Sequence, residues 1–276
     1  MVEYVIANTT VVPVRENPSE GAEQLTQLLF GEVCEVLDRL PRWTKIRSTL
    51  DGQEGWVDFK MVSLASSLIA SSPHRLEAVV AAPMAAATPM DGGADLLLTL
   101  GTRLPNYSHG TFEVLGQQYL IDPTCVNITT AQRSTGEADL QQSDLQRSDL
   151  ATIAQSLLNA PYLWGGKNLM GMDCSGFTQV VYAAMGVNLL RNAREQMTQG
   201  ELVPSLADAQ PGDLAFFDHA DRDPKATNIS HVGLLLSPTE IIHCSGCVHI
   251  DTIDEQGIHL PDGSLTHHLV QIKRYL

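Results

Sequence analysis

The sequence has few basic side chains and no long apolar run. Lysine and arginine together number 17 against 32 acidic residues, which gives a formal net charge of −15. Phosphate backbones and anionic lipids attract proteins with a surplus of basic residues, so this charge argues against nucleic acid or a membrane surface as the main partner. No stretch approaches the ~20 consecutive apolar residues that a membrane span requires.

Cysteine is also sparse, with five residues in 276. An odd and scattered set does not make a disulfide framework, so the sequence favours a reduced protein. The N-terminus, MVEYVIANTTVV, lacks the basic segment, the apolar segment and the small-residue cleavage site of a secretory signal. We therefore expect a cytoplasmic location. The alternative that a signal has been trimmed away stays open.

The chain length suits two domains or three small ones, and 43% hydrophobic residues are enough for ordinary cores. Residues 1–66 contain short apolar runs separated by turn residues, which predicts a small, strongly bent β-barrel. A similar but weaker pattern at 75–130 predicts a second β unit. Within it, the alanine- and proline-rich segment 81–90 is expected to be a loop.

The last part of the chain, residues 145–276, changes character. A polar stretch at 131–147 is expected to be a linker or an exposed helix, and Ser148 or Asp149 is expected to cap a helix with one apolar face. Strands follow at 214–217, 230–236, 240–244, 248–253 and 269–275. Helices first and strands afterwards predict an α+β domain, in which the helices pack on an antiparallel sheet.

A candidate nucleophile, Cys174, precedes a run of apolar residues at helical spacing. The sequence therefore places this thiol in the first turn of a helix. Unpaired N–H groups and the positive end of the helix dipole are expected there to lower the thiol pKa and favour the thiolate. The alternative is that Cys174 is a small buried core residue.

Two histidines on successive predicted strands complete a candidate catalytic set. A hairpin loop centred near Pro238 would place residue 231 opposite residue 245, two positions beyond His243. Side chains two apart share a face of a sheet, so His231 and His243 are expected to be diagonal neighbours. One would take the thiol proton and the other would orient it, as in cysteine hydrolases. A loop one residue longer or shorter would separate them.

Five motifs in order and spacing resemble the NlpC/P60 cysteine peptidases: PYLWGG at 161–166, DCSGF at 173–177, QPGDLAFF at 210–217, HVG at 231–233 and IH at 242–243. The resemblance implies a papain-like fold and cleavage of cell-wall peptides, usually at the bond from the γ-carboxyl of D-glutamate to a diamino acid. It makes Cys174 the nucleophile, His231 the base and His243 the polar third member. It adds an oxyanion contact from the Tyr162 hydroxyl, and it implies no metal or cofactor.

The N-terminal half resembles a bacterial SH3-like domain, through LFGE at 29–32, WTKI at 43–46 and GQEGWV at 52–57. Two such units before this peptidase domain are similar to the γ-D-glutamyl-L-diamino acid endopeptidases that recycle murein peptides. In that subgroup the first SH3-like domain closes one end of the cleft and selects peptides with a free N-terminal L-alanine. The resemblance thus implies a small murein peptide as substrate. The second unit lacks the Gly-x-Trp closing signature.

One departure from the subgroup concerns substrate recognition. Its members often carry Arg-Asp-Ser or Arg-Asp-Ala after the first catalytic helix, whereas this chain has Arg191, Asn192 and Ala193. Asn192 keeps a hydrogen-bonding group but loses the negative charge, so another carboxylate is needed to bind a substrate ammonium. Glu54 is a candidate for that partner, with a solvated turn residue as the alternative.

Two further residues, next to the nucleophile, enter the predicted site. Asp173 either binds a substrate amine or caps the helix, and Ser175 is counted with the substrate-binding residues.

Other motifs give weaker indications of function. Cys244 and Cys247 form a Cys-x-x-Cys flanked by histidines, but a structural zinc site needs a second ligand pair and a redox motif needs a following helix. His219, His267 and His268 are expected in polar loops at the surface.

Two other functions stay open at this point. One is a cell-wall amidase or acyltransferase that uses the same Cys–His chemistry. The other is a non-catalytic SH3-like peptidoglycan-binding protein.

Overall fold

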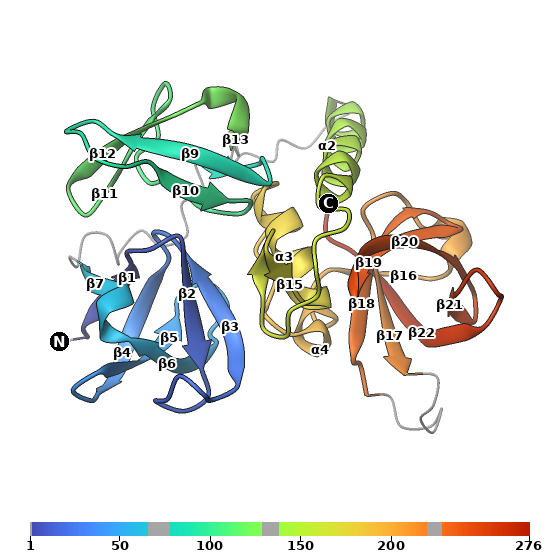
Figure 1. The fold of residues 1–276 in the computed structure, drawn as a ribbon. Coiled ribbons are helices and arrows are strands. Elements are labelled where there is room, and N and C mark those ends of the chain that lie inside the picture. The colour runs from blue at the N-terminus through green and yellow to red at the C-terminus, as the bar shows by residue number, and fades with distance from the viewer. Residues whose placement is uncertain (1, 66–77, 129–137, 220–227) are drawn as a thin grey trace.

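The computed structural model describes residues 2–65, 78–128, 138–219 and 228–276. These residues form two small all-β units and a third unit that combines helices with a larger sheet (Figure 1). Helix α3 (Cys174–Ala183), which begins with the candidate nucleophile, lies between the β units of the N-terminal half and the C-terminal sheet. Across the described ranges, no helix combines the length and the apolarity needed to span a membrane.

The first unit is a seven-stranded sheet in the order β3-β2-β6-β5-β4-β1-β7. Alternate residues point into its core, as Val12 and Val14 of one strand show, and this period of two is what half-buried strands require. The strands are β1 (Tyr4–Ala7), β2 (Val11–Arg15), β3 (Gln24–Leu29), β4 (Val33–Arg39), β5 (Trp43–Ser48), β6 (Glu54–Asp58) and β7 (Val62–Ala65), with a 3-10 turn at Phe59–Met61.

The second unit contains a four-stranded sheet, β10-β9-β12-β11, and a two-stranded sheet, β13-β8. The expectation of a loop at 81–90 is wrong, because β9 occupies most of this segment. Ala85 and Ala87 face the core between exposed neighbours, and alanine is a weak signal for a strand. The strands are β8 (Ala78–Val80), β9 (Met84–Pro89), β10 (Leu96–Thr99), β11 (Thr111–Val114), β12 (Gln117–Ile121) and β13 (Val126–Ile128), with a 3-10 turn at Pro123–Cys125.

The third unit begins with helix α2 (Ala138–Gln155). The helix runs through Ser148 and Asp149, so the expected cap at these positions is wrong. The expected apolar face does exist, and Leu150 and Ala154 are fully buried on it. Helix α3 (Cys174–Ala183) and the short α4 (Ala193–Gln196) follow, with the two-residue strands β14 (Lys167–Asn168) and β15 (Gly171–Met172) before α3.

The sheet of the third unit is antiparallel throughout, in the order β16-β22-β17-β18-β19-β20-β21. Because β21 also pairs with β22, the sheet closes on itself and leaves β16 at its edge. The last strand of the chain thus lies inside the sheet, between β16 and β17. The strands are β16 (Glu201–Val203), β17 (Leu214–His219), β18 (His231–Ser237), β19 (Glu240–Ser245), β20 (Cys247–Asp254), β21 (Gly257–His259) and β22 (Leu265–Arg274), with a 3-10 turn at Leu206–Asp208.

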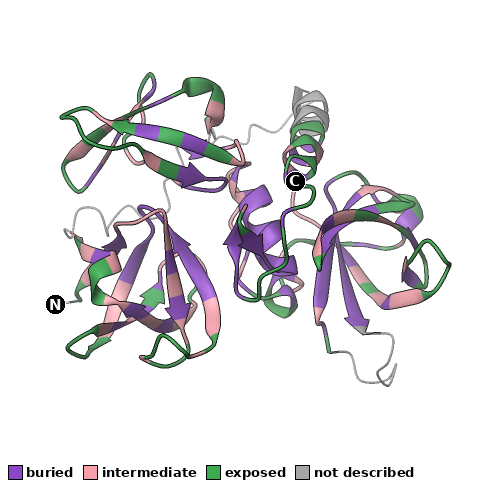
Figure 2. Cartoon of the chain, viewed as in Figure 1, coloured by how far each residue is buried: buried purple, intermediate pink, exposed green. Residues whose placement is uncertain are grey.

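Helix α3 is the buried element that joins the helices to this sheet. Nine of its ten residues are buried, and Figure 2 shows it as a continuous buried segment. One hydrophobic cluster contains its side chains together with those of strands β17, β18 and β19, namely Phe177, Val180 and Val181 with Phe216, Val232 and Ile242. The start of α3 is therefore held firmly against the strands that carry the two histidines.

Candidate functional site

The start of α3 is fixed by Asp173, which is the N-cap residue. One of its carboxylate oxygens accepts a hydrogen bond from the Gly176 N–H at 2.7 Å, and the other accepts from the Gly165 N–H at 2.9 Å. The Arg191 guanidinium binds both oxygens, at 3.0 and 2.6 Å. Asp173 thus caps the helix, one of the two roles expected for it, and its oxygens are occupied by bonds within the protein. Cys174 is the first residue of α3.

The two histidines lie as the hairpin register predicts. Gly233 of β18 pairs with His243 of β19, which places His231 diagonally beside His243. The His231 Nε2 and His243 Nδ1 atoms are 2.8 Å apart, and both side chains are buried. Since the Nε2 atom of His231 is hydrogen-bonded to His243, its other ring nitrogen, Nδ1, is the one that can accept the proton of a thiol.

The structure adds a residue that the sequence analysis missed. Asp251 of β20 lies with its Oδ2 atom 3.1 Å from His243 Nε2. Burial lowers the pKa of His243, and the hydrogen bond to His243 lowers the pKa of Asp251, so a neutral imidazole faces a carboxylate. A neutral imidazole has one donor and one acceptor. Its Nε2–H therefore donates to Asp251, and its Nδ1 accepts from His231 Nε2–H.

A cleft of about 560 Å³ opens above these groups, within the size range of ligand pockets. Of the residues expected in the site, six line this cleft: Tyr162, Asp173, Cys174, Ser175, Asn192 and His231. Two others, Arg191 and His243, lie behind it, fully buried. Ser175 donates its hydroxyl to Asp173 and accepts from Arg191 at 2.8 Å, so it supports the start of α3.

Glu54 is not among the cleft residues. It pairs across β5 and β6 with Arg47, whose Nη2 lies 2.6 Å from its carboxylate, and with Lys45 at 3.7 Å. The hypothesis that Glu54 binds a substrate ammonium is therefore corrected, because its carboxylate forms ion pairs with Arg47 and Lys45 on the outer surface of the first unit. The carboxylate of Glu195 does not line the cleft either, but it is bonded to Asn192, which does. Glu195 Oε2 accepts from the Asn192 backbone N–H at 3.1 Å and from its amide at 2.9 Å.

The first unit forms one wall of the cleft. Leu25 lines it, and the Trp164 indole N–H donates to Glu23 at 2.8 Å. Gly165 has a φ of +71°, and a Cβ atom there would lie 2.4 Å from the Gln24 carbonyl oxygen, so only glycine allows this approach. The resemblance implied that the first SH3-like domain borders the cleft, and Leu25 of β3 does so.

Two buried side-chain contacts tie that wall to the third unit. The Arg191 Nε donates to the Thr26 hydroxyl at 2.7 Å, and the Lys167 ammonium pairs with Glu32 at 2.9 Å. Helix α3 and the first unit are thus joined through the same arginine that holds Asp173.

Tyr162 lines the cleft, close enough to Cys174 for the charge of that thiol to affect the pKa of the Tyr162 hydroxyl. Burial raises the pKa of this phenol, and the nearby Cys174 and Asp173 raise it further. The hydroxyl therefore stays protonated at neutral pH and is available as a hydrogen-bond donor.

His267 corrects a second expectation. It lies in β22 and not in a surface loop, is buried, and stacks on His231 with ring centroids 4.4 Å apart. His268 also lies in β22. The side chain of His219 lies outside the described residues. The thiol of Cys244 donates to the Met172 carbonyl at 3.2 Å, and all five cysteines are free.

The ionisation of Cys174 differs from the sequence-based expectation. Burial, followed by the negative charge of Asp173, raises the pKa of the thiol to about 12. Hydrogen bonds from the backbone N–H groups of Val232 and Ser175, and the charge of Arg191, act in the opposite direction. The expected lowering of this pKa is therefore wrong. The helix start does supply N–H groups, but desolvation of the charged sulfur outweighs them.

This raised pKa predicts how Cys174 reacts with iodoacetamide. A group with a raised pKa loses its proton only as the pH approaches that value, and the thiolate is the reactive form. Labelling of Cys174 should be slow at pH 7 and should accelerate by about tenfold per pH unit up to pH 10, without a plateau. Peptide mapping by mass spectrometry follows each cysteine separately. A plateau below pH 8 would instead indicate a stable thiolate–imidazolium pair in the resting protein.

The buried Arg191 predicts a stability effect. Replacing Arg191 with methionine leaves the Asp173 carboxylate buried without its cation, which costs about 3–5 kcal/mol when one partner of a buried pair is removed. Urea denaturation followed by far-UV circular dichroism measures the loss. Arg194 is an exposed arginine on α4 and serves as the matched control. Arg194→Met should stay within about 0.5 kcal/mol of the parent, and similar losses in both variants would contradict the assignment.

Comparisons with known proteins agree with this architecture. Residues 159–268 match the NlpC/P60 family, and residues 10–63 match the bacterial SH3 domain. Two similar curated proteins are named gamma-D-glutamyl-L-lysine dipeptidyl-peptidase. The Bacillus subtilis protein is 29% identical over 230 residues, which cover 79% of this chain and 71% of the relative. The Bacillus cereus protein is 28% identical over 232 residues, which cover 79% of this chain and 66% of the relative, slightly less than two thirds of its length.

The fold is also similar to solved structures. A crystal structure of an NlpC/P60 family protein from Bacillus cereus covers 99% of both chains, with a TM-score of 0.79 and 21% identity. An NlpC/P60 endopeptidase from Photobacterium damselae subsp. piscicida covers 98% of this chain and 65% of that chain, with a TM-score of 0.59 and 16% identity. The chain therefore carries an NlpC/P60 domain behind an N-terminal bacterial SH3 domain.

Proposed function

We propose that the protein is a papain-like cysteine endopeptidase that hydrolyses the γ-D-glutamyl-L-diamino acid bond of free murein peptides with an N-terminal L-alanine. The observation that carries this proposal is the meeting of Cys174 and His231 in one cleft, with His231 bonded to His243 behind it. The names of the two Bacillus relatives support the choice of the scissile bond.

The mechanism follows from the proton positions. Cys174 Sγ attacks the γ-carbonyl carbon while its proton passes to His231 Nδ1. With a pKa of about 12, the thiol gives up this proton during the attack and not before it. The imidazolium that forms keeps its Nε2–H directed at His243 Nδ1, and Asp251 holds His243 in the tautomer that accepts it. His231 then protonates the leaving amine, and water releases the acyl group from sulfur.

Two donors support the tetrahedral intermediate. The backbone N–H of Cys174 lies in the first turn of α3, where N–H groups lack partners within the helix. The neutral hydroxyl of Tyr162 is the second donor in this proposal. Donors placed in advance around a developing oxyanion lower the barrier strongly, because they need no reorganisation during the reaction.

The selectivity for short peptides rests on the wall from the first unit. Leu25 lines the cleft, and the hydrogen bond between Glu23 and Trp164 holds the first unit against it. We propose that these residues close the cleft at the end where the N-terminus of the peptide binds. In place of Glu54, we propose that Glu195 binds the substrate ammonium and supplies the negative charge that Asn192 lacks, since the two side chains are hydrogen-bonded to each other.

One assay tests the proposed function. The protein is incubated with L-Ala-γ-D-Glu-diaminopimelate and, separately, with intact sacculi, and the products are identified by mass spectrometry. We expect L-Ala-γ-D-Glu and free diaminopimelate from the tripeptide and no release from sacculi. The Cys174→Ala variant is the control for contaminating hydrolases. Cleavage of sacculi with an intact tripeptide, or release of a peptide from its sugar, would refute the proposal and indicate a wall hydrolase or an amidase.

A further inference from the structure

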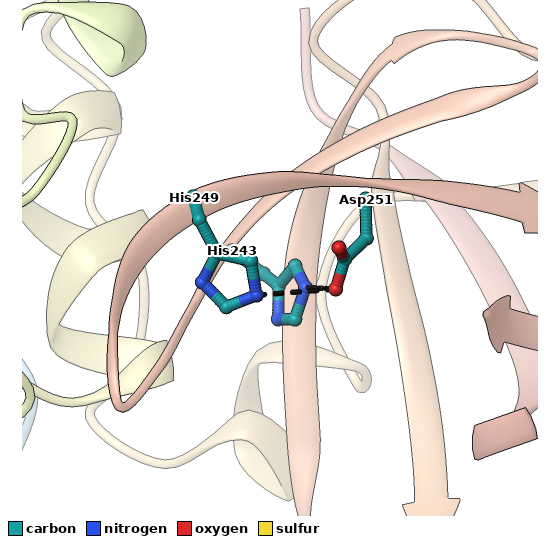
Figure 3. Close-up of side chains that lie close together, drawn as sticks. All are labelled: His243, His249 and Asp251. Carbon is teal, nitrogen blue, oxygen red and sulfur yellow. Dashed lines mark hydrogen bonds and ion pairs between the residues drawn. The ribbon is translucent and has the colours of Figure 1, made fainter. Parts of the chain in front are cut away.

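Three side chains behind the cleft bring metal-binding atoms together. His243, His249 and Asp251 each offer one ligand atom, and these atoms lie within 4.8 Å of one another (Figure 3). Asp251 Oδ2 is 3.1 Å from the Nε2 atom of each histidine. Figure 3 shows both imidazole rings directed at this one carboxylate oxygen. The proposed reaction uses His243 and Asp251, but it gives no role to His249.

The hydrogen bonds of His249 define which atom faces the carboxylate. Its Nδ1 lies 2.8 Å from the Cys247 carbonyl oxygen. A carbonyl oxygen only accepts, so Nδ1 carries the proton. In a neutral ring the Nε2 lone pair then points at Asp251 Oδ2, which is also an acceptor. Two acceptors at 3.1 Å are stabilised only by a cation between them, either a proton or a metal ion.

The geometry favours a divalent metal ion as that cation. Two ligands at the usual ~2.0–2.1 Å from a tetrahedral zinc ion lie about 3.3 Å apart, close to the 3.1 Å between Asp251 Oδ2 and the Nε2 atom of each histidine. Metal-bound histidines normally donate their second ring N–H to a carbonyl oxygen or another acceptor, and His249 does so with Cys247. Two imidazoles and one carboxylate with an open position suit Zn²⁺ or its neighbours in the first transition row.

Access to this cluster comes from the side of His249. The His249 side chain is 32% exposed, whereas that of His243 is 2% exposed. An ion can therefore meet His249 and Asp251 first and reach His243 Nε2 with little rearrangement.

We propose that His243, His249 and Asp251 bind a divalent transition-metal ion, Zn²⁺ in the first place, and that this ion inhibits the peptidase. The inhibition follows from the position of one proton. With zinc on its Nε2, His243 must carry its proton on Nδ1 and donate it to His231 Nε2. His231 in its neutral form then holds its own proton on Nδ1, the nitrogen that would otherwise accept the proton of Cys174.

The inhibitory part of this inference rests on the proposed function, whereas the binding part does not. The two parts are therefore tested separately. Binding is measured in the Cys174→Ser variant, so that the catalytic thiol cannot serve as a ligand. Isothermal titration calorimetry with Zn²⁺ should show one site per chain. Co²⁺ should give the visible absorption of a tetrahedral nitrogen and oxygen site, without the near-ultraviolet band of a thiolate ligand.

The variant that tests the site is His249→Gln in the same background. Loss of an outer hydrogen-bond partner alone costs 10–100-fold in metal affinity, so loss of a ligand should weaken zinc binding by more than about tenfold. His259→Gln is the matched control, because His259 Nε2 also pairs with an aspartate, Asp254, at 2.9 Å, and its Nδ1 also faces a carbonyl oxygen. The control should bind zinc like its parent. Equal affinity in the His249 variant, or a cobalt–thiolate band from Cys244 or Cys247, would overturn the site.

Inhibition is then measured on the chain with Cys174 intact, with each variant compared with its own metal-free rate. Zinc should inhibit the parent and the His259 variant at concentrations that match the binding isotherm, and EDTA should restore the rate. The His249 variant should need at least about tenfold more zinc, as for binding. Binding at His249 without inhibition would refute the switch but leave the site. An inactive metal-free parent would refute the proposed function and leave the binding result unaffected.

Discussion

Replacing His231 with alanine is expected to lower kcat by about 10²–10⁴-fold on the tripeptide substrate. The thiol of Cys174 has a raised pKa, so attack depends on a base that takes its proton in the same step. His231 lines the cleft together with Cys174 and is bonded to His243, so it is the proposed base. Steady-state kinetics on L-Ala-γ-D-Glu-diaminopimelate measure the loss, and circular dichroism checks that the variant is folded.

The His243→Ala variant separates the two histidine roles. Removing His243 leaves His231 able to accept a proton but without a partner for its Nε2–H, so the loss of kcat should be smaller than for His231→Ala. His259 lies in β21 and is not among the residues that line the cleft, so the His259→Ala variant should retain the parental rate. Small and equal losses in the His231 and His243 variants would be incompatible with the proposed pair.

Acetylation of the N-terminal alanine of the tripeptide is expected to reduce kcat/KM by roughly 10² or more. An acetylated peptide lacks the ammonium that Glu195 and Asn192 are proposed to bind, and it adds bulk at the end of the cleft that Leu25 and Trp164 are proposed to close. A site built for a polar group rejects a substrate without it, because its own polar groups are then left unpaired.

The chain itself offers a matched test of this selectivity. Glu195→Gln removes the charge but keeps the hydrogen bond to Asn192, so it should lose activity on the free peptide and little on the acetylated one. The two kcat/KM values should thus approach each other, while Cys174 stays reactive toward iodoacetamide at high pH. If the parental protein cleaves free and acetylated peptides equally well, the N-terminal half is not a selectivity gate.

Much of the site could be predicted from local sequence patterns. The apolar spacing after Cys174 predicts α3 and its first residue, because helical periodicity is a local property. The Ser237–Thr239 turn sets the register of β18 and β19, and this register alone brings His231 beside His243. Both features depend on residues that are close together in the sequence.

The features that the sequence did not reveal depend on distant pairings or on burial. Asp251 joins the site through the register of β19 with β20, in which His243 pairs with His249 and Asp251 lies two residues further on the same face. His267 arrives on a strand from the end of the chain. The pKa of Cys174 reflects desolvation by the whole fold, whereas the helix start is only one local contribution. The second unit, residues 75–130, stays a predicted SH3-like barrel.

The place of β22 has a consequence for the synthesis of the protein. This strand, the last of the chain, lies between β16 and β17 and also carries His267 against His231. Domains form in the order in which they leave the ribosome, so the first unit and α3 emerge long before the sheet can close. A nascent chain whose β22 has not yet left the ribosome has an open sheet, and the proposed site lacks the His267 side chain that stacks on His231. Any activity that depends on the proposed site should therefore begin only after β22 has left the ribosome.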